Sequence, residues 1–295
     1  MSTLVSVDLD DIACYTGIHG LPAPEAGSVG LVLERALPRF LEVFAALDVR
    51  ATFFVIGRDL ERDLQGAGRG AALLREALQS GHELASHSYA HDYGMISWSV
   101  ERIAADLARA DELLRHLGAE PRGFRAPGYL HDARMLRQVA ALGYHYDSSL
   151  LPSPPYFAVK QGVLAAMKVA GRASESRLGH ARAFFGPTTP HLLVESGLWE
   201  FPMSVSPTLR WPLIGTTVLA GPEPARRLAH AQASSLAWLH LELHGIDLLD
   251  ADTDGLSALA RREVSLRTPM SSRRERLQAL LRARGGGQPI RDALG

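Results

Sequence analysis

The sequence contains a single cysteine, Cys14, among its 295 residues. One thiol cannot form a disulfide within the chain, and it excludes zinc sites built from two or more thiolates. Any metal site must therefore use histidine and carboxylate ligands. The lack of paired cysteines also fits a reducing compartment, so we expect a cytoplasmic protein.

The sequence also lacks an excess of charge and long apolar runs. Lys and Arg together number 31 against 32 Asp and Glu, a formal net charge of -1, so no nucleic-acid partner is expected. No apolar run reaches the roughly 20 residues that a membrane-spanning helix needs. Charge occurs at Asp8 before the core of a signal peptide could form, so we expect no cleaved leader. Peripheral contact with the inner membrane face stays an open alternative.

The composition, 46% hydrophobic and 21% charged, is typical of a globular protein, and its pattern alternates between strand-like and helix-like segments. Predicted strands lie at 4–7, 51–56, 83–86, 123–125, 144–146, 198–201 and 238–244. Predicted helices lie at 31–47, 71–79, 97–117 with Ser97 as its N-cap, 132–142, 223–235 and 271–284. This alternation favours an α/β protein with a parallel sheet or barrel.

Three regions interrupt the alternation. Residues 12–27 are rich in glycine, proline and small residues and predict a loop. The proline-rich residues 150–196 predict an insertion with a little helix, and glycines after the last helix predict a flexible tail at 285–295.

Four polar residues near two strand ends suggest a metal site. Asp8 and Asp10 lie two residues apart, so their side chains point the same way, and burying both is costly unless they share a cation or a proton. His87 and His91 lie four apart just after a predicted strand and can be directed at one point. Such histidine pairs also occur by chance as surface or core residues. Two histidines with one carboxylate would form a divalent-metal site.

Five sequence elements, in this order, resemble the polysaccharide deacetylase superfamily, the carbohydrate esterases that share the NodB homology domain. They are VDLDDIACYTGIHG, SHSYAH, RAPGY, YDSSLLPS and LHLELHGID. The D-x-D form of the first element resembles the branch of peptidoglycan-deacetylase-like, allantoinase-like and lipid-linked aminoarabinose deformylase-like proteins. The resemblance implies one distorted (β/α) barrel of about seven parallel strands. It spans 1–284 as a single domain, with the insertion around 150–196 and the C-terminal helix 271–284.

The resemblance implies roles for the residues of the first three elements. Asp10, His87 and His91 would hold one divalent metal ion, with zinc expected first and cobalt, iron or nickel as alternatives. Asp8 would be the general base, and Arg125 would keep it ionised and oriented.

The resemblance implies further roles near the substrate. The N–H of Gly128 is a candidate oxyanion donor, and Tyr129 would line the cleft. His244 would protonate the leaving amine, and Asp147 would orient it and raise its pKa. Periodicity alone does not choose between His240 and His244, but the family's pattern of His followed by a small residue favours His244.

The expected function is metal-dependent hydrolysis of an N-acyl group, acetyl or formyl, on an amino sugar or a sugar-containing intermediate. Apolar residues within 150–222 could form a wall for a glycolipid substrate or could be ordinary core, so lipid linkage stays open. Two alternatives remain, an allantoinase-like hydrolase of a small cyclic amide or ureide and a catalytically inactive carbohydrate-binding barrel. The sequence leaves the oligomeric state undetermined.

Overall fold

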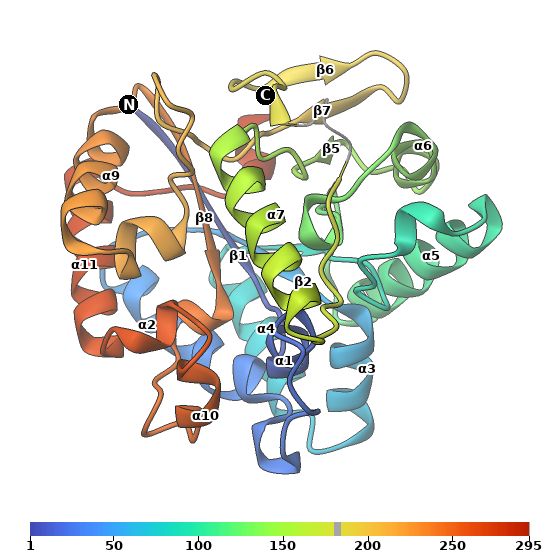
Figure 1. Ribbon diagram of the computed structural model, residues 1–295. Helices are drawn as coiled ribbons and strands as arrows, with labels where there is room; N and C mark the ends of the chain where they lie inside the picture. The colour runs from blue at the N-terminus through green and yellow to red at the C-terminus, as the bar shows by residue number, and fades with distance from the viewer. Residues whose placement is uncertain (180–183, 295) are drawn as a thin grey trace.

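The computed structural model describes residues 1–179 and 184–294, and its centre is one eight-stranded sheet (Figure 1). The strand order is β6-β7-β5-β4-β3-β2-β1-β8, and all neighbours are parallel except β6 and β7. The strands are β1 (Ser2–Asp8), β2 (Thr52–Val55), β3 (Glu83–Ser86), β4 (Gly123–Phe124), β5 (Tyr146–Asp147), β6 (His191–Leu193), β7 (Leu198–Glu200) and β8 (Trp238–His244).

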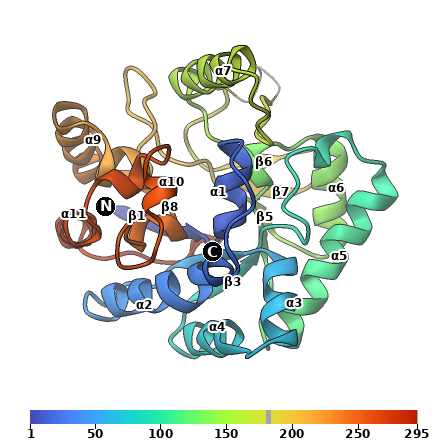
Figure 2. The same ribbon diagram turned by 60° about the horizontal axis from the view of Figure 1, so that its bottom comes forward.

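Helices surround this sheet as a ring, and α1 lies over the middle of the ring (Figure 2). They are α1 (Ile12–Ile18), α2 (Leu37–Ala45), α3 (Gly57–Gln65), α4 (Arg69–Gln79), α5 (Val100–His116), α6 (Ala133–Ala141), α7 (Pro154–Val169), α9 (Glu223–Ser235), α10 (Ser257–Ala260) and α11 (Met270–Arg284). Among the described residues, no helix is both long and apolar enough to cross a bilayer.

The predicted distorted (β/α) barrel is confirmed. Seven strands are parallel, and β6 adds an antiparallel edge strand to them. β7 and β8 do not pair directly, but the chain leaving β7 closes the gap. The backbone N–H of Ser204 donates to the carbonyl of His240 at 3.2 Å, and the N–H of His240 donates to Ser204 Oγ at 2.8 Å.

The core explains why the strand pattern is readable from the sequence. All residues of β1 except Ser2 are buried, as expected for a parallel strand that is covered on both faces. Its residues Val5 and Val7 belong to the same hydrophobic cluster as Phe40 and Phe44 of α2. Burial of this apolar surface is the main force that holds the helices on the sheet.

The structure corrects two predictions near the start of the chain. Residues 12–18 form helix α1 instead of a loop, because the Asp11 carboxylate caps it by accepting from the N–H of Ile12 at 2.8 Å. Ser97 is not the N-cap of α5. Ser99 is, and its Oγ accepts from the N–H of Arg102 at 3.3 Å. Helix α3 was missed because its residues are mostly polar and Leu60 is its only buried aliphatic side chain.

The insertion contains more structure than the sequence indicates. Helix α7 is 16 residues long, and β6 extends the sheet beyond β7. The insertion prediction also covers 180–183, which lie outside the described residues.

The predicted flexible tail is corrected as well. Gly285 ends α11 with a φ of 74° and lets the chain turn back towards β1. Gln288 then bridges to β1, since its N–H donates to the carbonyl of Thr3 at 3.0 Å and its carbonyl accepts from the N–H of Val5 at 3.1 Å. Ile290 is fully buried, so this segment is part of the core.

Candidate active site

The predicted site residues meet at the carboxyl ends of the parallel strands, where α/β proteins place their binding sites. Asp8 ends β1, and His244 ends β8 directly beside it in the strand register. His87 follows β3, and Arg125 follows β4. Asp147 ends β5.

Asp10, His87 and His91 form a buried group with the spacing of metal ligands. One Asp10 oxygen lies 3.3 Å from Nε2 of each histidine, and the three potential ligand atoms lie within 4.8 Å of one another. Nδ1–H of His87 donates to the carbonyl of Arg125 at 2.7 Å, which leaves Nε2 bare for a ligand. Asp10 Oδ1 and His91 Nε2 are buried without a hydrogen-bond partner, so the donor set fits a divalent cation.

The electrostatics of this group agree with its geometry. Although burial opposes ionisation, the neighbouring His91 and His87 hold the pKa of Asp10 well below its usual value. Burial also opposes the charged form of His87, but Asp8 and Asp10 raise the pKa of this histidine above its usual value. The carboxylate therefore stays ionised, as a metal ligand must.

The turn between the two histidines is held in an unusual backbone conformation. Ser88 and His91 have φ angles of 61° and 48°, in the left-handed region that non-glycine residues rarely adopt. Ser88 Oγ accepts from the N–H of His91 at 2.9 Å, and the Asp106 carboxylate accepts from the N–H groups of Tyr89 and Ala90 at 2.8 and 2.9 Å. These bonds fix the strained turn that presents His91.

Arg125 fixes Asp8 in position. Its guanidinium is fully buried, and Nη1 donates to Asp8 Oδ1 at 2.5 Å. The other N–H groups bond to Ser6 Oγ and to the Oγ and carbonyl of Ser148. The second oxygen of Asp8 lies 3.8 Å from His87 Nε2, at the edge of the metal-ligand group.

His244 lies on the opposite side of Asp8. Its Nε2 is 3.3 Å from Glu242 Oε1, which also accepts from the hydroxyl of Tyr129 at 2.8 Å. Burial opposes protonation of His244, but Glu242, Asp8 and Asp10 together raise its pKa to about 9. The imidazole is therefore protonated at neutral pH and can serve as a proton donor.

His240 occupies a different position from His244. Its Nε2 is 3.0 Å from Ser6 Oγ and 3.3 Å from Arg125 Nη2, beneath the cluster. Burial and the charge of Arg125 lower its pKa to about 3, so His240 is neutral. His240 supports Arg125, and His244 is the histidine at the open side of the site, 19% exposed.

The structure does not bring Asp147 to His244. Asp147 Oδ1 accepts from Ser149 Oγ at 2.6 Å, and its neighbour across the strand register is Glu200, a second buried acid. The acids beside His244 are instead Glu242 and Asp247, whose Oδ2 accepts from the His244 N–H at 3.0 Å. These two acids, and not Asp147, are therefore the ones placed to orient His244.

Glu242 was missed by the sequence analysis, although a signal existed. In the alternation through β8, residues 240, 242 and 244 share one face, and an acid in that buried row has no place in an ordinary core. Cys14 was not among the predicted site residues. It is buried, and its Sγ lies 3.5 Å from His91 Nδ1, so it contacts a candidate metal ligand.

Gly128 and Tyr129 form the tight turn after Arg125. Both have positive φ angles, 60° and 66°. A Cβ on Gly128 would lie 2.7 Å from the ring of Tyr93, which packs edge-on against His91 at 5.2 Å between ring centroids. The Tyr129 ring borders the cavity next to His244.

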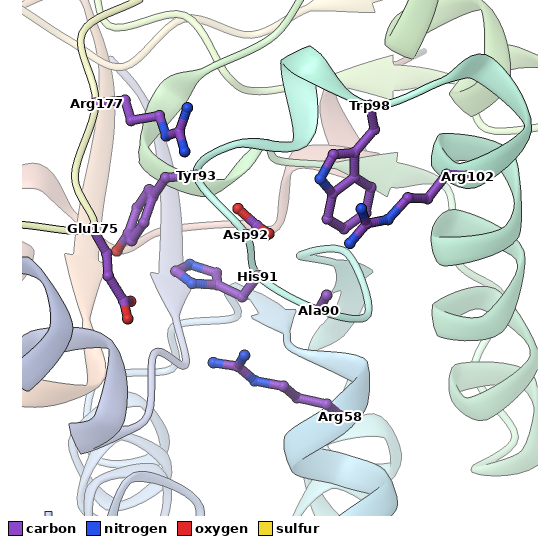
Figure 3. A pocket seen from close by; sticks show the side chains of 9 residues that line it. All are labelled: Arg58, Ala90, His91, Asp92, Tyr93, Trp98, Arg102, Glu175 and Arg177. Carbon is purple, nitrogen blue, oxygen red and sulfur yellow. The ribbon is translucent and has the colours of Figure 1, made fainter. Parts of the chain in front are cut away.

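Two cavities flank this cluster. The first, about 380 Å³ in volume, lies beside His91 and is lined by Arg58, Trp98, Arg102 and Arg177 among others (Figure 3). The second, about 350 Å³, lies beside His244 and is lined mainly by apolar and aromatic side chains such as Tyr129, Tyr156, Trp211 and Ile214.

Comparisons with known proteins find relatives for part of the chain. Residues 26–146 match the family model described as polysaccharide deacetylase. A chitin deacetylase of Colletotrichum lindemuthianum is 34% identical over 121 residues, which are 40% of this chain and 47% of that protein. A peptidoglycan-N-acetylglucosamine deacetylase of Bacillus cereus is 31% identical over 97 residues, which are 32% of this chain and 42% of that protein. The chain thus matches less than half the length of these curated relatives.

A solved structure shows the shared fold over nearly the whole chain. It is that of a Mycobacterium smegmatis protein described as a polysaccharide deacetylase, with a TM-score of 0.61 at 17% identity. The superposition covers 99% of this chain and 88% of that one. The matched segment 26–146 includes His87, His91 and Arg125, and the fold brings Asp8, Asp10 and His244 to them from outside it. Residues 26–146 therefore match the polysaccharide deacetylase family, and the chain as a whole shares the fold of that solved structure.

Proposed function

We propose that the protein is a divalent-metal-dependent hydrolase that removes an N-acyl group, acetyl or formyl, from an amino sugar. The observation that carries this proposal is the buried group of Asp10, His87 and His91, with Asp8 and His244 placed beside it. A base, an acid and a metal-ligand group in contact are the parts that amide hydrolysis needs. The two relatives named as deacetylases of chitin and of peptidoglycan N-acetylglucosamine support an N-acetylated sugar as substrate.

Asp10, His87 and His91 would hold the metal ion. Two imidazoles and one carboxylate are borderline ligands that suit zinc, with cobalt, iron or nickel as alternatives. A divalent cation bound there would polarise the substrate carbonyl and make a water molecule more acidic. The bond from His87 Nδ1–H to the Arg125 carbonyl keeps the ring in the orientation and tautomer that a ligand requires.

Asp8 would remove the proton from the attacking water. Its Oδ1 is occupied by Arg125, so Oδ2 is the oxygen that can accept a proton. The Arg125 guanidinium holds Asp8 in place, and its four other contacts prevent the pair from moving.

His244 would donate a proton to the leaving amine. Its Nε2 is held by Glu242 on the side of the site opposite the metal ligands, and its backbone is held by Asp247. The N–H of Gly128 is the candidate oxyanion donor, and Tyr129 would border the sugar.

An apolar surface near His244 supports a glycolipid as a finer substrate hypothesis. The cavity beside His244 shares Trp211 with a neighbouring groove that is lined by Leu209 and Leu228. Leu209 is 73% exposed and Leu228 is 59% exposed, so this groove presents an apolar surface to solvent. A lipid portion of the substrate, or a membrane surface, would cover them.

The test combines metal content with a substrate panel. We expect about one divalent ion per wild-type chain by elemental mass spectrometry, and much less in His87→Ala, because one of three protein ligands is lost. We expect wild-type protein to release acetate or formate from N-acylated chito-oligosaccharides, and His87→Ala to be inactive. His145→Ala, which removes an exposed histidine away from the site, serves as the matched control.

Other outcomes would decide between the alternatives. Hydrolysis of a cyclic ureide but not of N-acyl sugars would favour the allantoinase-like alternative. Bound metal without hydrolysis of any compound would favour an inactive carbohydrate-binding barrel. If liposomes neither bind the protein nor change its turnover of N-acyl sugars, the glycolipid hypothesis is wrong.

A further inference from the structure

The cavity beside His91 carries an unusual concentration of arginine. Arg58 comes from α3, Arg102 from α5, and Arg177 from the segment after α7. Figure 3 shows the three guanidinium groups approaching the space around His91 and Asp92 from different sides. At about 380 Å³, the cavity falls in the usual range of small-ligand sites, roughly 300–1,000 Å³.

These positive charges are poorly neutralised by the protein. Arg58 has one carboxylate within reach, Asp59 at 3.8 Å, and Asp59 contacts Arg62 more closely, at 3.1 Å. In the part of the chain that the structure describes, neither Arg102 nor Arg177 has a carboxylate within 4.0 Å.

The acids of this cavity leave a net positive charge. Asp92 is engaged in its own turn, where Oδ1 accepts from the N–H of Gly94 at 2.6 Å. Glu175 also lines the cavity, near Arg58, and partly offsets the arginines. Three guanidinium groups against two carboxylates favour a ligand that brings at least one negative charge.

One of the arginines is also preorganised. The guanidinium carbon of Arg102 lies 3.6 Å from the centroid of the Trp98 ring, so it stacks on a flat aromatic face. Stacking limits the motion of the side chain and leaves its N–H groups free along the edge. Guanidinium groups presented in this way bind planar carboxylates and phosphates through paired hydrogen bonds.

The cavity borders the candidate metal group through His91. His91 lines it, Arg58 Nη2 approaches Cys14 Sγ at 3.8 Å, and Cys14 Sγ lies 3.5 Å from His91 Nδ1. A substrate whose N-acyl group lies at Asp10 and His91 would therefore extend a neighbouring substituent into this cavity.

We propose that the cavity lined by Arg58, Arg102 and Arg177 binds an anionic group, a carboxylate or a phosphate, on the substrate. The protein then selects acidic amino-sugar derivatives over neutral ones. This inference rests on the proposed N-deacylase function, because it names the class of sugar that the same site takes. It is independent of the apolar cavity beside His244.

The test measures binding separately from turnover. Isothermal titration of the metal-loaded protein compares neutral N-acetylglucosamine with N-acetylglucosamine 6-phosphate and with N-acetylmuramic acid, which carries a carboxylate. We expect one or both acidic sugars to bind at least about tenfold more tightly than the neutral one, and less so at high salt. Comparing the affinities of the phosphorylated sugar and the carboxylated sugar identifies which anion the cavity binds.

Four variants locate the effect. Arg102→Gln and Arg177→Gln should each weaken binding of the preferred acidic sugar about three- to tenfold. Glu175→Gln should strengthen it, because a competing negative charge is removed. Arg227→Gln, which removes an equal charge from the exposed face of α9, should leave the preference for acidic sugars unchanged. Thermal melting of each variant confirms that it is folded.

Equal affinity for neutral and acidic sugars would overturn the inference, as would no detectable binding of either acidic sugar. An identical loss in Arg227→Gln would also overturn it, because the effect would then come from net charge. Failure of the proposed function is seen separately, as an absence of acetate or formate release whatever the binding data show.

Discussion

At the scale of single residues, the acid–base roles depend on which neighbours each side chain has. His244 and His240 stand on the same face of β8, four residues apart, yet their pKa values move in opposite directions. His240 lies against a buried guanidinium, which disfavours a second positive charge. His244 lies against Glu242, whose negative charge favours the protonated imidazole.

A pH profile tests this assignment. In wild-type protein, the pKa of His244 is raised to about 9, so kcat/KM should fall as the pH rises through that value and the proton donor is lost. Glu242→Gln removes the main group that stabilises the protonated imidazole. The upper limb of the profile should therefore move down by about one pH unit or more.

Asp147→Asn is the matched control for this prediction. Asp147 is a buried acid at a strand end, but it contacts Ser149 and neighbours Glu200, not His244. The upper limb of its profile should stay at the wild-type position. If Asp147→Asn moved the limb and Glu242→Gln did not, the original expectation for Asp147 would be restored.

At the scale of elements, the segment after α11 shows how a glycine-rich stretch can be part of the core. Three glycines follow the helix, and only the first two have a positive φ. Gly287 is enclosed, because a Cβ there would lie 2.6 Å from Val5 Cγ2. This close approach lets the chain run along β1 and insert Ile290 beside Leu4 and Phe54.

Truncating Ile290 measures how much this segment contributes to the stability of the fold. Ile290→Ala should lower the free energy of unfolding by about 2–4 kcal/mol, because a fully buried side chain leaves a cavity. Val194→Ala removes an 88% exposed aliphatic side chain and should change it by less than about 0.5 kcal/mol. Urea denaturation gives both values. Equal, small effects would show that residues 285–295 behave as a flexible tail.

At the scale of the whole molecule, the candidate metal group joins distant parts of the chain. Asp10 follows β1, and the two histidines follow β3. Helices α2, α3 and α4 lie between them in the sequence. Without a cation, Asp10 Oδ1 and His91 Nε2 are buried without hydrogen-bond partners. A bound ion would therefore stabilise the folded state against the unfolded chain.

Metal removal tests this linkage. Treatment with a chelator should lower the Tm of the wild-type protein by about 5 °C or more, and added zinc should restore it. His87→Ala should show a lower Tm that responds little to either treatment, whereas His145→Ala should behave as wild type. A wild-type Tm that is unchanged by chelator and by added zinc would contradict the ligand assignment.

The sequence by itself determined that parallel strands alternate with helices, and it showed which polar residues follow those strands. Buried parallel strands are short apolar runs, and the groups that follow them must gather at one edge of the sheet, so local pattern was enough to place Asp8 and His87 there. Arg125 was added by the family resemblance. Tertiary structure alone decided which buried acid faces His244, because strand register and side-chain packing set that contact over long sequence distances. It also decided that three arginines from separate elements share one cavity, since no spacing in the sequence relates them.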